Sequence, residues 1–208
     1  MIAIVDYRAG NLASVARALE HLGQPGVITS DPDIIAAADR IVFPGVGAAG
    51  EAMRNLHELR LKPVLLQAVA DGKPFLGICL GYQILFERSE EDGGVACLGL
   101  LPGRVTRFAE SAAGATPRLK VPHMGWNQAA FLRPHPVWHG VPAGCEFYFV
   151  HSYYPRAPAK VTACTTDYGV AFASGAATGS LVGFQFHPEK SGLPGLRLLH
   201  NFCHWSPE

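Results

Sequence analysis

The first half of the chain alternates short β-rich runs with amphipathic stretches, and this rhythm constrains the fold more than any other feature. In chain order the segments are IAIVDY, NLASVARALEHLG, PGVITSD, RIVFPG, a long helical span, PFLGIC and LGYQILFE. Strands that alternate with helices pair in parallel and are covered by those helices. We therefore expect an α/β fold with a central, mostly parallel sheet flanked by helices.

The second half of the chain has a different pattern. Strand-like runs separated by turn residues follow one another there: GRVTRF, QAAFL, EFYFVHSYY, VTACTT, VAFASG and SLVGFQFHP. This pattern predicts added antiparallel strands, and a last helix is expected over residues 193–204. Near the N-terminus, Asn11 is a candidate N-cap for a helix that ends at Gly23. No low-complexity linker or internal repeat divides the sequence, so we expect one domain over residues 1–208.

Charge and composition exclude several classes of function. Lys and Arg together number 17, as do Asp and Glu, and like charges form no run, so no nucleic-acid or anionic-membrane partner is expected. No stretch reaches the roughly 18 apolar residues that a membrane span needs. The N-terminus has no basic leader, and the five cysteines contain no C-x-x-C pair, which argues against a disulfide framework or a metal site. We expect a cytoplasmic protein with free thiols.

The segment KPFLGICLGYQ places Cys79 on a turn between a predicted strand and a predicted helix. Glycines at 77 and 81 make room for a sharp turn that lifts a nucleophile clear of the sheet, as the nucleophile elbow of α/β-hydrolases does with serine. A helix N-terminus also favours a thiolate, and the backbone N–H of Leu80 can stabilise an oxyanion. The motif alone leaves a buried structural cysteine equally open.

A nucleophilic cysteine needs a base, and the base needs a group that orients it. In GFQFHPEKS, His187 and Glu189 are separated only by a proline, which ends the strand and favours extended geometry. Alternate residues of an extended segment point the same way, so Glu189 can accept from one ring nitrogen of His187 while the other faces Cys79. The histidines at 21, 57, 135, 139, 200 and 204 lie on predicted helices or in polar loops and compete less well.

The segment RIVFPGVGAAG has two interpretations. Gly45, Gly47 and Gly50 fit the dinucleotide-binding fingerprint G-x-G-x-x-G. That site needs an acid at the end of the next strand, whereas Asp71, which has the spacing, lies in a turn before that strand. The other interpretation is a flexible backbone at the edge of the sheet that offers an N–H group to an oxyanion. We prefer the second interpretation, and a plain glycine-rich turn stays open.

With these features the sequence resembles the class I, or triad, glutamine amidotransferases. The motifs GxCxGxQ and HPE are shared by that whole class, so they indicate the chemistry only. The segments DYRAGNL, FPGVGA, LGLLPGRV, PHMGWN and FYFVHSYY look like those of the glutaminase subunits of imidazole glycerol phosphate synthase, and the resemblance spans nearly the whole chain. It implies the three-layer class I glutamine amidotransferase-like fold.

Carried over to this sequence, the resemblance implies a Cys-His-Glu triad. Cys79 would attack the side-chain amide of L-glutamine, His187 would protonate the leaving ammonia, and Glu189 would orient His187. The reaction would pass through a glutamyl thioester and would need no metal or organic cofactor. The site residues implied beyond the triad are Val46, Gly47 and Leu80 for the oxyanion, and Gly47, Gln83, Ser152 and Tyr153 for the glutamine.

A partner subunit is also expected. Ammonia is mostly protonated at neutral pH and is then no nucleophile, so its release into solvent would waste it. The chain has no apparent second substrate domain, and the resemblance implies that the acceptor site lies on a (β/α)8-barrel cyclase subunit in a heterodimer. Met124 and Trp126 in PHMGWN belong to residue types enriched at interfaces. The residues predicted at the interface are Asn11, Pro122, Met124, Trp126 and Lys190.

Three functions stay open on the sequence. The first is the glutaminase subunit that supplies ammonia for imidazole glycerol phosphate and an aminoimidazole carboxamide ribotide (AICAR) in histidine biosynthesis. The second is the glutaminase subunit of another synthase, such as those serving anthranilate or pyridoxal phosphate. The third is a cysteine hydrolase or binding protein outside the amidotransferases. We expect the first, with an isolated chain that is nearly inactive until the cyclase binds.

Overall fold

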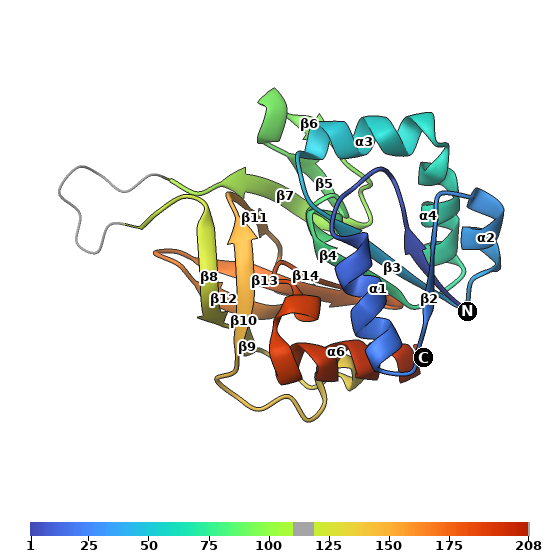
Figure 1. Ribbon diagram of the computed structural model, residues 1–208. Helices are drawn as coiled ribbons and strands as arrows, with labels where there is room; N and C mark the ends of the chain where they lie inside the picture. The colour runs from blue at the N-terminus through green and yellow to red at the C-terminus, as the bar shows by residue number, and fades with distance from the viewer. Residues whose placement is uncertain (110–118, 208) are drawn as a thin grey trace.

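An eight-stranded sheet forms the centre of the computed structural model, which describes residues 1–109 and 119–207 (Figure 1). The strand order is β2-β1-β3-β4-β14-β13-β12-β9. The bounds are β1 Ile2–Val5, β2 Gly26–Thr29, β3 Arg40–Gly45, β4 Phe75–Cys79, β9 Ala130–Phe131, β12 Thr162–Asp167, β13 Ala171–Thr178 and β14 Leu181–Phe184. The strands from β2 to β14 in this order pair in parallel, and β13, β12 and β9 add antiparallel strands. The expected mostly parallel sheet with antiparallel additions is confirmed.

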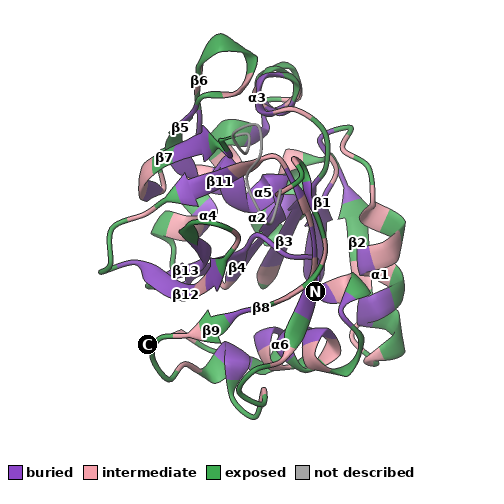
Figure 2. Cartoon of the chain, turned by 90° about the vertical axis from the view of Figure 1, so that its left-hand side faces the viewer, coloured by how far each residue is buried: buried purple, intermediate pink, exposed green. Residues whose placement is uncertain are grey.

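Helices cover both faces of the parallel strands. Their bounds are α1 Leu12–His21, α2 Pro32–Ala37, α3 Ala49–Glu58, α4 Leu61–Ala70, α5 Leu80–Gln83 and α6 Gly192–His204. In β1, Ile2 and Ile4 belong to the core that includes Leu19 of α1, whereas Ala3 and Val5 belong to the core on the opposite face. Figure 2 shows that the central strands are buried. Apolar side chains on both faces are what a sheet between two helical layers requires.

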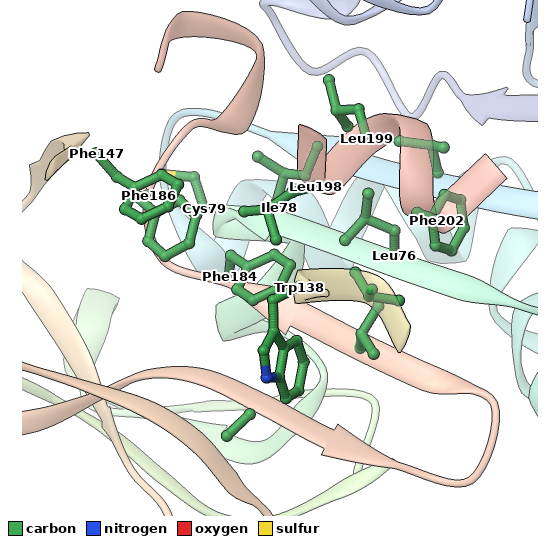
Figure 3. Packing of buried hydrophobic residues seen from close by; sticks show 14 of the residues in the cluster. Leu76, Ile78, Cys79, Trp138, Phe147, Phe184, Phe186, Leu198, Leu199 and Phe202 are labelled. Carbon is green, nitrogen blue, oxygen red and sulfur yellow. The ribbon is translucent and has the colours of Figure 1, made fainter. Parts of the chain in front are cut away.

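One of the two cores anchors the region around Cys79. Figure 3 shows Leu76 and Ile78 of β4 among the side chains of α6, including Leu198 and Phe202, with Cys79 at one end of the cluster. Full burial of an aliphatic or aromatic side chain stabilises a fold by about 1.5–3 kcal/mol. The strand that ends at Cys79 is therefore held firmly along its length.

Two smaller sheets and three short 3₁₀ helices complete the described part of the chain. β8 His123–Gln128 pairs antiparallel with β10 Glu146–His151. The other sheet has the order β11-β7-β5-β6, with bounds β5 Phe86–Ser89, β6 Val95–Ala96, β7 Leu101–Arg107 and β11 Tyr153–Arg156. The 3₁₀ helices are η1 Glu91–Gly93, η2 Pro136–Trp138 and η3 Pro188–Lys190. No helix within the described ranges is long and apolar enough to cross a bilayer.

Several expectations about individual elements are wrong. The helix expected over LGYQILFE ends at Gln83, because Phe86–Ser89 forms β5 and pairs with β7. The long helical span after β3 consists of two helices, because Arg60 between them has a left-handed backbone with φ 56°. Asn11 directly precedes α1 as expected, but its side chain makes no capping hydrogen bond. The final helix begins at Gly192 and ends at His204, close to the expected bounds.

Candidate active site

Cys79 is the last residue of β4 and lies directly before α5. Its backbone has φ 54° and ψ −111°, a conformation that L-residues populate sparsely and that costs on the order of 1–3 kcal/mol. The absence of a side chain at Gly81 allows this turn, since a Cβ there would lie 1.8 Å from the carbonyl oxygen of Phe43 on β3. The turn therefore presses α5 against β3 and holds Cys79 in a strained position at the edge of the sheet.

The thiol of Cys79 lies among groups from other strands. Gln185 directs Nε2 toward Sγ at 3.8 Å, and Sγ lies 3.9 Å from the backbone oxygen of Val150 in β10. Contacts of this length with sulfur are weak, so they orient the thiol without blocking it. Cys79 is only 6% exposed, and what reaches it must come through the cavity described below.

His187 and Glu189 form a buried pair at the start of η3. Nδ1 of His187 lies 2.8 Å from Oε1 of Glu189, and the two side chains are 1% and 0% exposed. The backbone of His187 is fixed on both sides: its N–H donates to the oxygen of Tyr148 at 2.9 Å, and its oxygen accepts from the hydroxyl of Ser191 at 2.6 Å. Nε2 has no hydrogen-bond partner among the described residues. The ring is thus held rigidly with one nitrogen free.

The electrostatics of His187 link it to Cys79. Burial lowers the pKa of a histidine, because it disfavours the charged ring. At His187 the interactions with Cys79 and Glu189 outweigh burial, and the pKa is raised above its ordinary value. Both neighbours therefore favour the protonated ring, the state that His187 reaches once it has accepted a proton.

A cavity of about 340 Å³ opens beside Cys79, at the small end of the range for ligand pockets. Every residue predicted for the oxyanion or for the glutamine lines it. The lining residues are Val46, Gly47, Cys79, Leu80, Gln83, Glu91, Pro122, Val150, His151, Ser152 and Tyr153. Segments far apart in the sequence therefore meet around the thiol.

The glycine segment after β3 forms one rim of this cavity. Gly45 is paired with Cys79 in the β3–β4 ladder, and a Cβ on Gly45 would lie 1.9 Å from the hydroxyl of Tyr7. Gly47 has φ 102°, which residues with a side chain rarely adopt. The hydroxyl of Tyr7 is buried without a partner among the described residues. Burial raises its pKa, with the nearby charge of Cys79 adding to the effect, so Tyr7 stays neutral.

The dinucleotide interpretation of the same segment fails at the N-terminus of α3. The N–H of Ala49 donates to Oε2 of Glu91 at 2.8 Å, and the N–H of Gly50 donates to Oδ2 of Asp92 at 3.1 Å. A dinucleotide would place its pyrophosphate at this helix end. The chain's own carboxylates occupy that position. The absence of a side chain at Gly50 therefore lets η1 pack against α3 and does not make room for a phosphate.

Gln83 connects the cavity wall to the nucleophile. Its Nε2 donates to the backbone oxygen of Tyr153 at 2.8 Å and to Oε1 of Gln185 at 3.0 Å. Gln185 in turn directs its own amide toward Cys79. The network fixes the wall of the cavity relative to the thiol.

The sequence analysis missed several residues of this site. Glu91, His151 and Gln185 line the cavity or contact Cys79, and none of them was singled out. Glu91 is one of three acids in SEED, with nothing local to distinguish it. Gln185 was detectable, since the strand-like run SLVGFQFHP predicts that its side chain points the same way as that of His187, two positions later.

The residues predicted at the interface lie in different settings. Met124 and Trp126 are 62% and 54% exposed on β8. Pro122 lines the cavity, and Lys190 ends η3. Asn11 instead directs its side chain at Glu189, 2.5 Å from Oε1. A role for each of the five in partner binding stays a prediction.

Comparison with known families and structures gives the class to which the chain belongs. Residues 3–205 of the chain match the family "Glutamine amidotransferase class-I". A crystal structure of a glutamine amidotransferase superposes with a TM-score of 0.74 at 17% identity, covering 99% of this chain and 100% of the other. The PurLQS structure from Thermotoga maritima gives a TM-score of 0.73 at 18% identity, covering 98% and 97%. These likenesses establish the fold.

Curated relatives place the chain more narrowly. It is 55% identical to the imidazole glycerol phosphate synthase subunit HisH of Methylococcus capsulatus, over 99% of this chain and 97% of that one. Identity to the HisH subunit of Aromatoleum aromaticum is 51%, over 99% of both chains. The chain therefore belongs to the class-I glutamine amidotransferases and, within them, to the HisH subunits of imidazole glycerol phosphate synthase.

Proposed function

We propose that this chain hydrolyses L-glutamine through a Cys79-His187-Glu189 triad. The observation that carries the proposal is the strained Cys79 turn in the cavity wall together with a buried His187–Glu189 pair whose ring interacts with Cys79. A thiol, a base and a group that orients the base are the parts that nucleophilic acyl transfer needs. Membership of the class-I glutamine amidotransferases supports the same reaction.

The proposed reaction has two halves. The proton of Cys79 passes to Nε2 of His187, and the sulfur bonds to the side-chain amide carbon. Backbone N–H groups of residues 46–47 and of Leu80 stabilise the oxyanion. His187 returns the proton to the amide nitrogen, ammonia leaves and a glutamyl thioester remains. Water then attacks the thioester with His187 as general base, which releases glutamate and restores the thiol, while Glu189 holds the ring.

The cavity lining supports an amino-acid substrate. Glutamine carries an α-ammonium group, and Glu91 contributes a carboxylate to the lining. Burial raises the pKa of this carboxyl, while the hydrogen bond from Ala49 opposes the rise. A bound ammonium would complete the neutralisation of Glu91. We therefore assign Glu91 to the α-ammonium and Gln83, Ser152 and Tyr153 to the rest of the substrate.

The proposed partner is the cyclase subunit of imidazole glycerol phosphate synthase, a (β/α)8 barrel, in a cytoplasmic heterodimer. The subunit names of the curated relatives support a partner. The complex would convert glutamine and a phosphoribulosyl-formimino carboxamide ribonucleotide to imidazole glycerol phosphate, AICAR and glutamate in histidine biosynthesis. Exposed Met124 is paired with Val150 across the β8–β10 ladder, and Val150 lines the cavity. The exposed strand thus lies one strand away from the site.

A glutaminase subunit serving anthranilate or pyridoxal phosphate synthesis is the alternative. It would use the same triad, so the site alone does not separate the two. The identity of 55% to a HisH subunit favours the first. Glutamate release that rises with the cyclase, but not with other synthase subunits, decides between them.

The test of the triad is a Cys79→Ala variant assayed for glutamate release in the presence of the cyclase subunit. We expect a loss of at least about 10³-fold, because no other group replaces the nucleophile. Cys145→Ala is the matched control, since Cys145 is a partly exposed free thiol outside the cavity lining. Undiminished activity in Cys79→Ala would remove the catalytic assignment.

A further inference from the structure

We infer that Asn11 is a positioning residue of the triad, whose side-chain amide holds the carboxyl group of Glu189 aimed at His187; the inference rests on the proposed function. Nδ2 of Asn11 lies 2.5 Å from Oε1 of Glu189, although 178 positions separate the two residues. The same oxygen lies 2.8 Å from Nδ1 of His187. Two N–H groups therefore converge on one carboxylate oxygen.

Burial makes these two donors important. The Glu189 side chain is 0% exposed, and a buried carboxylate needs hydrogen bonds to offset its lost hydration. The other oxygen, Oε2, has no partner among the described residues. Of the two donors to Oε1, Nδ1–H belongs to a ring whose charge changes as Nε2 gains and loses a proton, whereas the amide of Asn11 carries no charge at any stage. Asn11 thus holds Glu189 in place independently of the charge on the ring.

The chemistry of an amide fixes what this contact can do. An amide nitrogen donates and cannot accept, and the opposite orientation of the amide would set its oxygen against the carboxylate. Oε1 accepts from both nitrogens. An accepting Oε1 selects the tautomer of His187 with the proton on Nδ1, which leaves Nε2 as the base. Asn11 therefore acts on Cys79 through Glu189 and His187.

The local backbone explains why asparagine occupies the position. Asn11 has φ 70°, in the left-handed region that asparagine tolerates better than most residues with a side chain. Its amide is free for Glu189, because it does not cap α1. The same loop also touches the glycine segment, since a Cβ on Gly10 would lie 2.9 Å from Cγ2 of Val46. One loop thus contacts both the acid of the triad and the predicted oxyanion residues.

Two substitutions separate the donor from the backbone. Asn11→Asp keeps the shape and the tolerance for positive φ but replaces the donor by a second carboxylate. Asn11→Gly removes the side chain and suits φ 70° better than asparagine does. Arg8→Gly is the control, because Arg8 lies in the same loop with φ 64° and pairs with Glu58 at the surface, away from the triad.

The first readout is the alkylation of Cys79 by iodoacetamide in the isolated chain at a series of pH values, followed by mass spectrometry of its peptide. Two carboxylates at 2.5 Å cannot both ionise, so in Asn11→Asp the one negative charge is shared between residue 11 and Glu189, and less of it faces His187. We expect the pH of half-maximal alkylation to rise by about one unit in Asn11→Asp and to stay unchanged in Arg8→Gly.

The second readout is glutamate release by the complex with the cyclase subunit. We expect kcat to fall about 100-fold in Asn11→Asp and about 10-fold in Asn11→Gly, with KM within twofold, because Asn11 does not line the cavity. Should Asn11→Asp fail to fold, wild-type kcat in Asn11→Gly overturns the inference. Lower activity in the complex with an unchanged alkylation profile would also overturn it, since a role at the partner face alone gives that result. If the wild-type complex has no glutaminase activity, the proposed function is wrong. The alkylation of Cys79 still tests the inference about Asn11 in that case, because it needs no glutamine turnover.

Discussion

Gly81 decides whether the turn at Cys79 can exist. A methyl group at this position would lie 1.8 Å from the oxygen of Phe43, within the backbone of the neighbouring strand. Neither the strand nor the turn can give way, because both are buried and paired. The residue that follows the nucleophile by two positions therefore fixes the geometry of the nucleophile.

We predict that Gly81→Ala lowers the free energy of unfolding by about 3 kcal/mol, the upper part of the range for overpacking, and lowers kcat more than tenfold. Denaturant titration and glutamate release measure the two effects. Gly179→Ala is the control, because Gly179 has φ 51° with nothing near its Cβ position. This substitution should lower the free energy of unfolding by about 1 kcal/mol and leave activity intact. Equal stability in both variants would contradict the steric argument.

The residues of the site differ in how far the sequence reveals them. Cys79 could be singled out because its neighbours Gly77 and Gly81 are local signs of a turn, and His187 because an acid follows it closely. The contact of Asn11 with Glu189 could not be predicted, since it joins a loop after β1 to the end of the chain. Glu91 likewise gains its place in the cavity only through η1 packing against α3.

At the scale of elements, β8 and β10 hold a buried histidine pair, of which His151 lines the cavity. The backbone oxygen of Tyr153 only accepts, so His151 carries its proton on Nδ1, 2.7 Å away. Its Nε2 then accepts from Nδ1 of His123 at 3.0 Å, and Nε2 of His123 accepts from Asn127 at 3.2 Å. Burial lowers the pKa of His123 to about 4 and that of His151 to about 3, so both rings are neutral at pH 7.

This pair gives the fold a dependence on pH. The pKa of His151 in the folded state lies below its unfolded value of about 6.5. The contribution of the neutral ring to the free energy of unfolding is therefore complete above pH 6.5 and is lost as the pH falls toward 3. At pH 5 the loss is about 2 kcal/mol. We predict that wild type is more stable than His151→Gln at pH 7 and that this difference shrinks by about 2 kcal/mol at pH 5, measured by urea denaturation. A difference independent of pH would show that His151 titrates normally.

The helices and strands were predictable where apolar residues recur at a regular spacing and strands alternate with helices. The parallel strands β1, β3 and β4 and the helices α1 and α6 followed from apolar spacing. The apolar run after Cys79 fits a helix as well as a strand, and only the pairing of β5 with β7 makes it a strand after Gln83. The strand over His123–Gln128 is set by β10, which lies some 20 residues later in the chain and leaves no local signal.

At the scale of the whole molecule, the exposed side of β8 is the surface that we expect the partner to cover. Met124 and Trp126 present large apolar side chains to solvent, and the ring of Trp126 packs edge-on against Tyr148 at 6.1 Å. Tyr148 accepts from the backbone N–H of His187. A partner that covers Trp126 would thus bear on the strand that holds the predicted base. The prediction of one domain over residues 1–208 stays a prediction.

We predict that Trp126→Ala weakens binding of the cyclase subunit more than tenfold, or about 1.4 kcal/mol, because aromatic residues at the centre of an interface carry much of its energy. Titration of the cyclase subunit with glutamate release as the signal measures the change. The control is Ile28→Ala, since Ile28 is 42% exposed but lies on β2, at the opposite edge of the large sheet from β9. Both variants should melt within a few degrees of wild type. Equal weakening by the two would place the partner elsewhere, because exposed apolar area alone would then account for the loss.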